Sequence, residues 1–141
     1  MVDRRPGFHS TFRGVGDRGD FSPAAWEQSF RPTASSLWEN DGGGSISHAD
    51  EGGERRVLIL EFVDGLVSIA YDDAERYWVA APSGGLASEF VVSGNGATVP
   101  AGSGFALGTA WAIVEQFLRA PRRRPSASWV DADTLEWPDD Y

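Results

Sequence analysis

The sequence predicts an α+β fold: a curled antiparallel β-meander packed by one main helix in the C-terminal half, followed by a final strand that carries Trp129. Apolar and β-branched runs separated by turn residues extend over residues 56–92, which is typical of antiparallel strands. Over residues 103–120 the apolar positions instead recur every three or four residues, as in an amphipathic helix. With 141 residues, 41% of them hydrophobic, the chain is long enough for one domain around a single core.

The N-terminal third predicts little regular structure. Residues 1–21 are rich in Gly and Arg and follow no period, so we expect an irregular arm or tail. Residues 22–30 predict a short helix, because a serine and a proline occupy its N-cap and first position. A short strand is expected at 37–39. Two glycine clusters then predict a flexible acidic loop over 40–53 around a short strand at Ile46.

The middle of the chain predicts four consecutive strands. Residues 56–63 form an apolar, β-branched run, and Asp64-Gly65 supplies a two-residue hairpin turn, because both residue types tolerate positive φ. Residues 66–71 return as the second strand. An acidic turn leads to a third strand at 76–81, and a Pro-Ser-Gly-Gly break leads to a fourth at 89–92. Tight turns between consecutive strands predict an antiparallel meander.

The helix predicted over 103–120 has an apolar stripe that would pack on the sheet. The stripe consists of Phe105, Leu107, Ala110, Trp111, Val114, Phe117 and Leu118. Ser103 is expected as the N-cap and Pro121 ends the helix. Four arginines between 119 and 124 lie near its C-terminus, where the helix dipole favours positive charge. Residues 126–130 predict the last strand.

The expected division of the chain is therefore an irregular arm, one domain and an acidic tail. The arm covers residues 1–21 and the α+β domain covers 22–130. The C-terminal tail, residues 131–141, has five acidic residues and no basic one.

Composition excludes several classes of site. The formal net charge of −9 repels nucleic acid and anionic lipid, so we expect no direct contact with either. The chain has no Cys and therefore no disulfide, thiol nucleophile or Cys-ligated metal. His9 and His48 lack partners at ligand spacing, so we expect no metal and no cofactor. No secretory signal is recognisable, and the longest nearly apolar run, 57–63, is too short to cross a bilayer; we expect a cytoplasmic protein.

Negative charge is concentrated on the predicted strands and at the C-terminus. Residues 32–114 hold eleven acidic residues against three Arg. The acidic turn at 72–75 is followed, after Arg76, by two aromatic residues. It can be a solvated turn, a catalytic carboxylate pair that would need burial to separate its pKa values, or a protein-binding patch in which charges steer and aromatic side chains anchor. The candidate partner-binding residues are Asp72, Asp73, Glu75, Tyr77, Trp78, Asp131 and Asp133.

The second half of the chain combines several short motifs in a fixed order. A glycine-containing loop, Pro100, an amphipathic helix ending in Phe117-Leu118, and then Pro125 and Trp129 together resemble immunity protein family one of bacterial polymorphic toxin systems. The likeness covers a little over half of the chain. It implies a cytosolic antidote that is not an enzyme and that binds a toxin delivered between competing bacteria, often a nucleic-acid deaminase and sometimes a nuclease. It also implies that these motif residues are mostly structural and that partner contacts come from loops and sheet faces.

The leading hypothesis is an immunity protein, monomeric when free, that forms a one-to-one complex with its cognate toxin and covers the active site. Its acidic residues would pair with Arg or Lys, and Trp78 would fill a pocket of the toxin. The alternative is an acidic cytosolic chaperone for a secreted effector, which would bind an unfolded segment, usually as a dimer. A third hypothesis, an enzyme with a carboxylate pair in the curled sheet, requires two buried acids in one pocket.

Overall fold

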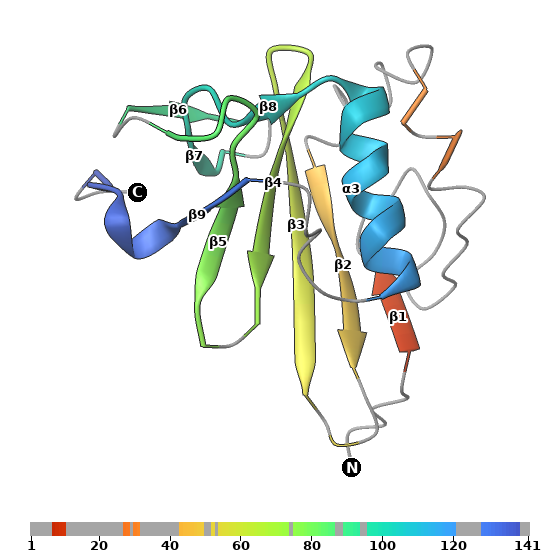
Figure 1. Cartoon of the computed structure of the whole chain (residues 1–141). Coiled ribbons are helices and arrows are strands. Elements are labelled where there is room, and N and C mark those ends of the chain that lie inside the picture. Colours follow the sequence, from red (N-terminus) through yellow and green to blue (C-terminus); the bar gives the residue numbers. More distant parts are fainter. Residues whose placement is uncertain are drawn as a thin grey trace.

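An antiparallel sheet with helix α3 across one face forms the body of the protein in the computed structural model (Figure 1). The structure describes residues 7–10, 27–28, 30–31, 43–49, 52, 54–73, 75–86, 89–93, 96–120 and 128–138. It confirms the predicted α+β class, with a meander, one main helix and a last strand that contains Trp129. The elements are β1 (Gly7–Ser10), β2 (Gly43–Ala49), β3 (Arg55–Val63), β4 (Leu66–Asp72), β5 (Tyr77–Ala80), β6 (Phe90–Val92), β7 (Thr98–Pro100), β8 (Gly104–Phe105), α3 (Leu107–Arg119), β9 (Trp129–Asp131) and the 3-10 helix η3 (Ala132–Thr134).

The sheet is built around the predicted β3–β4 hairpin. Its strands pair antiparallel in the order β1-β2-β3-β4-β5-β9, and β8 pairs with β4. Val63 lies opposite Leu66, which leaves Asp64 and Gly65 as the two-residue turn. Their φ angles are +51° and +80°, as a turn with positive φ at both central residues requires. The Asp-Gly turn prediction is confirmed.

Strand β2 contains the short strand expected at Ile46, but it extends over Gly43–Ala49, where the prediction of a loop was wrong. All seven of its residues pair with β3, and Ile46 is fully buried. At Gly43 φ is +148°, and a Cβ there would lie 2.3 Å from the carbonyl oxygen of Leu60. This glycine therefore permits the close approach of two strands instead of making a loop. On the outer side of β2, strand β1 pairs within the segment that was expected to be irregular.

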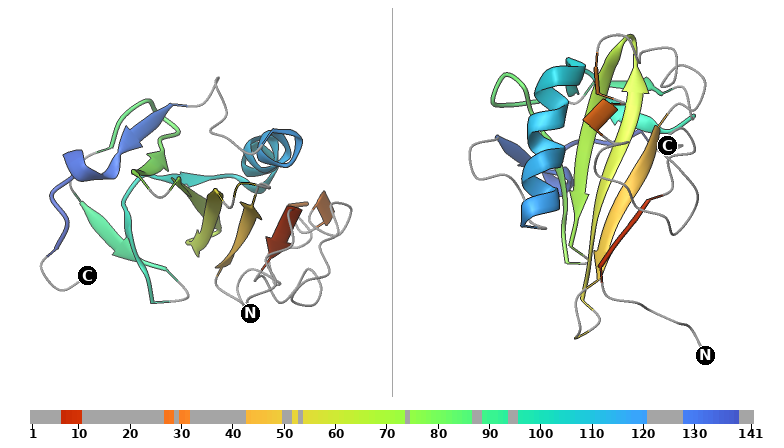
Figure 2. Two further views of the ribbon diagram at one scale, coloured as in Figure 1. Left: turned by 90° about the horizontal axis from the view of Figure 1, so that it is seen from below. Right: turned by 90° about the vertical axis from the view of Figure 1, so that its right-hand side faces the viewer.

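The structure has a strand at the position predicted for the fourth strand, but this strand does not pair with the partner that the meander prediction implied. Strand β6 does not join the meander but pairs with β7, and the two form a separate ribbon. The neighbour of β5 on its other side is β9. The two views of Figure 2 show α3 on one side of the sheet and the β6–β7 ribbon toward the other.

Helix α3 begins later than predicted, and Ser103 is not its N-cap. The N-cap is Ala106, which makes no side-chain capping bond. Ser103 is 1% exposed, and its hydroxyl donates to the carbonyl oxygen of Pro100 at 2.6 Å and lies 2.7 Å from Ser68 Oγ. The helix cannot begin at Ser103, because Gly104 and Phe105 are extended in β8 and pair with β4.

The core lies between α3 and the facing side of the sheet. The buried residues of α3 are Leu107, Ala110, Ile113, Val114 and Phe117, at helical spacing. They pack against alternate residues of the strands: Ile46, Leu58, Leu60, Phe62, Val67, Ile69 and Tyr71. The Tyr71 ring meets Phe117 and Trp129 edge-on, with centroid distances of 6.4 and 6.2 Å.

The segment expected as an acidic tail begins inside the fold. After β9 comes η3, and Ala132 and Leu135 are buried. The Trp137 indole Nε1 donates to the Ala132 carbonyl at 2.9 Å, and its ring lies 4.7 Å from the Phe90 ring. The first part of this segment therefore belongs to the packed structure.

Several expectations concern residues outside the described ranges. Among them are most of the arm, the N-cap of the first helix, the strand at 37–39, the arginines after Arg119, Pro121, Pro125 and residues 139–141. From the first predicted helix, Phe30 is buried and packs on Trp111 of α3, with a centroid distance of 5.6 Å. Within the described part, no helix is long and apolar enough to cross a membrane.

Replacing Gly43 by alanine is expected to lower the free energy of unfolding by about 1–3 kcal/mol, because the added Cβ collides with the β3 backbone. Gly108 is the matched control, since it is exposed in α3 and a Cβ there would meet no atom within 4 Å. Gly108→Ala should raise the free energy of unfolding by about 0.5–1 kcal/mol. Urea unfolding measures both values, and equal stabilities of the two variants would contradict the close β2–β3 approach.

Candidate protein-binding surface

The side of the sheet away from α3 gathers polar and acidic side chains. We call it the helix-free face, and its positions follow from the strand registers and the alternation of side chains along each strand. Its members are Gly43, Ser45, Ser47, Ala49, Arg55, Val57, Ile59, Glu61, Val63, Leu66, Ser68, Ala70, Asp72, Tyr77 and Val79. The β6–β7 ribbon and Trp137 lie over part of this face, around Ser68 and Ala70.

Hydrogen bonds and one aromatic pair hold the ribbon in place. The buried hydroxyl of Ser93, at the end of β6, donates to Glu61 Oε2 at 3.0 Å and accepts from the Ala97 N–H at 3.1 Å. Phe90 of β6 packs on Trp137. The ribbon is therefore a fixed part of the helix-free face, and Glu61 links it to the sheet.

A groove of about 270 Å³ lies between the β3–β4 turn and the ribbon. Most of its wall is apolar, and the lining residues are Val63, Asp64, Leu66, Ser68, Val91, Val99 and 100–104. Leu66 and Val91 stay 40% and 36% exposed. The hydroxyl chain from Ser68 through Ser103 to the Pro100 carbonyl fixes one wall. An apolar hollow with exposed apolar side chains is a surface that can receive a side chain of another molecule.

Asp72 and Tyr77 are cross-strand neighbours on the helix-free face. Tyr77 faces the side of Glu61 and Trp137, although 37% of the residue stays exposed. Burial of the phenol, and then the negative charges of Glu61 and Asp72, raise the pKa of Tyr77 to about 12. The phenol therefore keeps its proton to higher pH than an ordinary tyrosine and can donate a hydrogen bond.

Trp78 points to the opposite side of the sheet from Tyr77, because successive side chains alternate along β5. Its ring is partly buried against the core. The aromatic pair that the sequence placed in one patch is therefore separated by the thickness of the sheet. Trp78 would have to leave the core to fill a pocket of a partner.

The β4–β5 turn uses one of its acids for its own structure. Asp73 Oδ1 accepts hydrogen bonds from the backbone N–H groups of Glu75 and Arg76, at 3.0 and 2.9 Å. This arrangement is common for aspartate in turns. Glu75 is exposed, so Glu75 presents its charge to solvent while the Asp73 carboxylate stabilises the turn.

Asp131 brings the two predicted acidic segments together, because β9 pairs with β5 and places it opposite Trp78. Its Oδ1 accepts from the Asp133 N–H at 3.0 Å, and its Oδ2 accepts from Arg76 Nη1 at 2.6 Å. The backbone hydrogen bond from Asp133, and then Arg76, hold the pKa of Asp131 below its ordinary 3.8. Asp131 therefore joins β9 to the β4–β5 turn, whereas Asp133 is exposed in η3.

The strand register does not place the two carboxylates of the helix-free face side by side. Glu61 lies opposite Ser68, and Asp72 is four residues further along β4, which is about 13 Å of strand. Carboxylate pairs in glycoside hydrolysis are about 5–9.5 Å apart. In the described ranges no three His, Cys, Asp or Glu residues are grouped to hold a metal ion.

Sequence reasoning missed Glu61 and the groove. Glu61 interrupts an otherwise apolar strand, and that interruption was the available signal for a functional position. The groove has no comparable signal, because it joins the β3–β4 hairpin to residues of the ribbon and of the loop before β8, which only the fold brings together.

Tyr77 is expected to make stability fall at alkaline pH. The unfolded phenol ionises near pH 10.0 and the folded one near 12, so its stabilising effect is complete below pH 10 and is lost as pH rises toward 12. Between about pH 9 and about pH 11, the free energy of unfolding should therefore fall more in the wild type than in Tyr77→Phe. The other two tyrosines are common to both proteins. An equal fall would show that Tyr77 titrates normally.

Asp131→Asn is expected to lower the melting temperature at pH 7, because the amide can still accept from the Asp133 N–H but cannot pair with Arg76 as a charge. A lowered folded pKa means that the contribution exists above about pH 3.8 and disappears as pH falls below it. The difference between wild type and variant should therefore shrink in acid. Asp133→Asn is the control, and it should leave the melting temperature unchanged at both pH values.

Comparisons with protein-family models, with curated proteins and with solved structures give no match to this chain. A functional assignment must therefore start from the helix-free face, its acids and the groove beside it.

Proposed function

We propose that this protein is an immunity protein that binds and inhibits a cognate bacterial toxin in a one-to-one complex. The observation that carries the proposal is the position of its exposed apolar side chains. Among the described residues, the exposed large hydrophobic ones are Leu66, Tyr77, Val91 and Val92, and all four lie on the helix-free face or the ribbon over it. Exposed apolar groups gathered on one side are typical of a protein-binding surface.

The charge on the same side favours a basic partner. Glu61 and Asp72 lie on the helix-free face, and Asp64 and Glu75 lie in the turns at its two ends. Arg55 is the described arginine whose register places it on this face, at the first position of β3. With a formal net charge of −9, the chain attracts cationic surfaces from a distance. An enzyme that binds nucleic acid presents a cationic surface, so the proposed toxin is a nucleic-acid deaminase or nuclease.

In this proposal the acidic groups steer the toxin and the apolar groups hold it. Asp72, Glu75 and Tyr77 are the proposed contacts among the residues singled out in the sequence. Three of the others have structural roles. Trp78 packs against the core on the opposite side of the sheet, Asp73 stabilises the β4–β5 turn, and Asp131 pairs with Arg76. Inhibition would occur in the cytoplasm, by covering the active site of the toxin.

The protein should be used as bait in the native bacterium, and whatever co-purifies should be assayed alone and in the complex. A folded enzyme that is active alone and inactive at one-to-one stoichiometry would support the proposal. An unfolded effector segment bound to a dimer of this chain would instead identify a chaperone. A partner that keeps its full activity in the complex would also contradict the proposal.

Asp72→Arg combined with Glu75→Arg is expected to slow association with the toxin by about tenfold or more at low salt, because steering depends on the charge of the binding face. High salt should reduce the difference. Asp73 is left unchanged, since its carboxylate holds the turn.

The matched control is Glu27→Arg combined with Glu115→Arg, which gives the same change in net charge. Glu115 lies on α3, and Glu27 precedes Phe30, whose ring packs on α3. Stopped-flow association kinetics compare the two double variants. Equal slowing would show that only net charge matters and that the helix-free face is not the contact.

A further inference from the structure

We propose that the groove beside the β3–β4 turn is an anchor site for one aliphatic or aromatic side chain of a basic protein segment, with a neighbouring Lys or Arg that pairs with Asp64. The inference rests on the proposed function and specifies which contact holds the partner. Its basis is the shape, the lining and the charge of the groove.

The groove is preformed. Leu66 packs directly on the β8 backbone, since a Cβ at Gly104 would lie only 2.6 Å from the Leu66 Cβ. Ser68 and Ser103, 5% and 1% exposed, tie the Pro100 carbonyl to β4. Because its walls are already ordered, little conformational entropy is lost when a side chain enters.

The size and lining of the groove suit a side chain better than a cofactor. Pockets for small molecules are about 300–1,000 Å³, and this groove, about 270 Å³, lies just below that range. Its hydroxyl groups are already engaged with one another and with a backbone carbonyl. What it offers is apolar surface from Val63, Leu66, Val91 and Val99.

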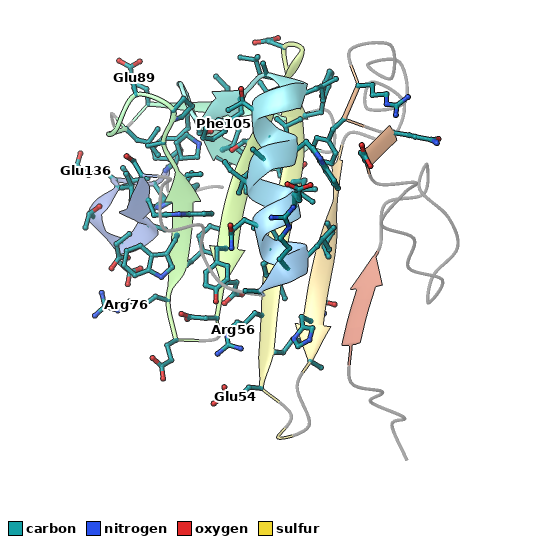
Figure 3. All side chains as sticks on the ribbon, turned by 45° about the vertical axis from the view of Figure 1, so that its right-hand side comes forward. Glu54, Arg56, Arg76, Glu89, Phe105 and Glu136 are labelled. Carbon is teal, nitrogen blue, oxygen red and sulfur yellow. The ribbon has the colours of Figure 1, made fainter. Side chains whose placement is uncertain are left out.

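The charge near the groove selects a cationic neighbour for that side chain. Asp64, exposed in the turn, is the ionisable residue of the lining, which includes no basic residue among those described. Arg55 and Arg56 begin β3, whereas Val63 ends it, about 26 Å away along the strand. Figure 3 shows Arg56 beside Glu54 at that far end, with Glu89 at the opposite end of the molecule. A Lys or Arg next to the inserted side chain would therefore meet Asp64 without a competing cation in the lining.

Adjacent residues of β6 provide a matched pair of variants. Val91 lines the groove, whereas Val92 does not, and both are exposed enough to accept a larger side chain. Val91→Trp fills the groove, and Val92→Trp adds the same ring next to it. Asp64→Asn removes only the charge, because asparagine also tolerates the positive φ of this turn.

The first experiment titrates the isotope-labelled full chain with N-acetyl-Arg-Leu-amide, using N-acetyl-Glu-Leu-amide as the charge control, and follows the backbone amides by NMR. We expect shifts at residues 64–66 and 101–104, with weaker binding of the Glu dipeptide. Val91→Trp should weaken binding at least about tenfold, and Val92→Trp should leave it within about twofold. Asp64→Asn should remove the preference for the Arg dipeptide. Shifts confined to other regions, or equal effects of the two Trp variants, would overturn the inference.

The second experiment measures the same variants in the toxin complex. Val91→Trp should raise the Kd at least about tenfold, mainly through faster dissociation, while Val92→Trp has little effect. A complex that is indifferent to Val91→Trp would overturn the anchor site and leave the proposed function intact. If no inhibitory complex exists, the proposed function fails, and the dipeptide titration alone decides whether the groove binds a cationic apolar segment.

Discussion

Strand β4 is buried on both faces, and this constraint places the other elements. Val67, Ile69 and Tyr71 pack under α3, whereas Ser68 and Ala70 face the ribbon. A polar side chain that is only 5% exposed needs a hydrogen-bond partner, and Ser103 provides it. The same contact brings the chain before α3 to the sheet, where it pairs as β8 and then enters the helix. The core, the ribbon and the groove therefore all meet at one strand.

The sequence was sufficient to predict those elements whose structure depends on residues close together in the chain. The Asp64-Gly65 turn requires positive φ at both residues, and the spacing of apolar residues in α3 follows from one buried side. The errors lie where distant contacts decide. In the sequence Gly43 is typical of a loop, but in the structure β3 lies so close that a Cβ at this position would collide with it. Ser103 resembles an N-cap until the pairing of β8 moves the start of the helix.

The candidate surface was less predictable than the fold, for a geometric reason. Tyr77 and Trp78 are adjacent in sequence and lie on opposite faces of β5, so adjacency was a poor guide to a shared patch. Asp131 is distant in sequence and yet lies beside the acidic turn, because β9 pairs with β5. Acidic composition correctly identifies regions of negative charge, but it does not distinguish Asp73, which builds its own turn, from Glu75, which is exposed.

In the proposed complex, the charges at the β4–β5 turn lie far from the apolar groove, in whose lining Asp64 is the acidic residue. Asp72 and Leu66 are the two ends of β4, about 20 Å apart along the strand, which exceeds the Debye length of about 8 Å at physiological salt. Charges at the β4–β5 turn can therefore affect the encounter without contributing directly to contacts in the groove. Salt screens exposed charges and leaves buried apolar contacts largely intact, so a complex held only by the acids would dissociate readily in the cell. In the proposed complex, the apolar groove is therefore the part that keeps the inhibitor bound. The hydrogen bond between Ser68 and Ser103 fixes the wall of this groove to β4, which is also the strand that places the other elements of the fold.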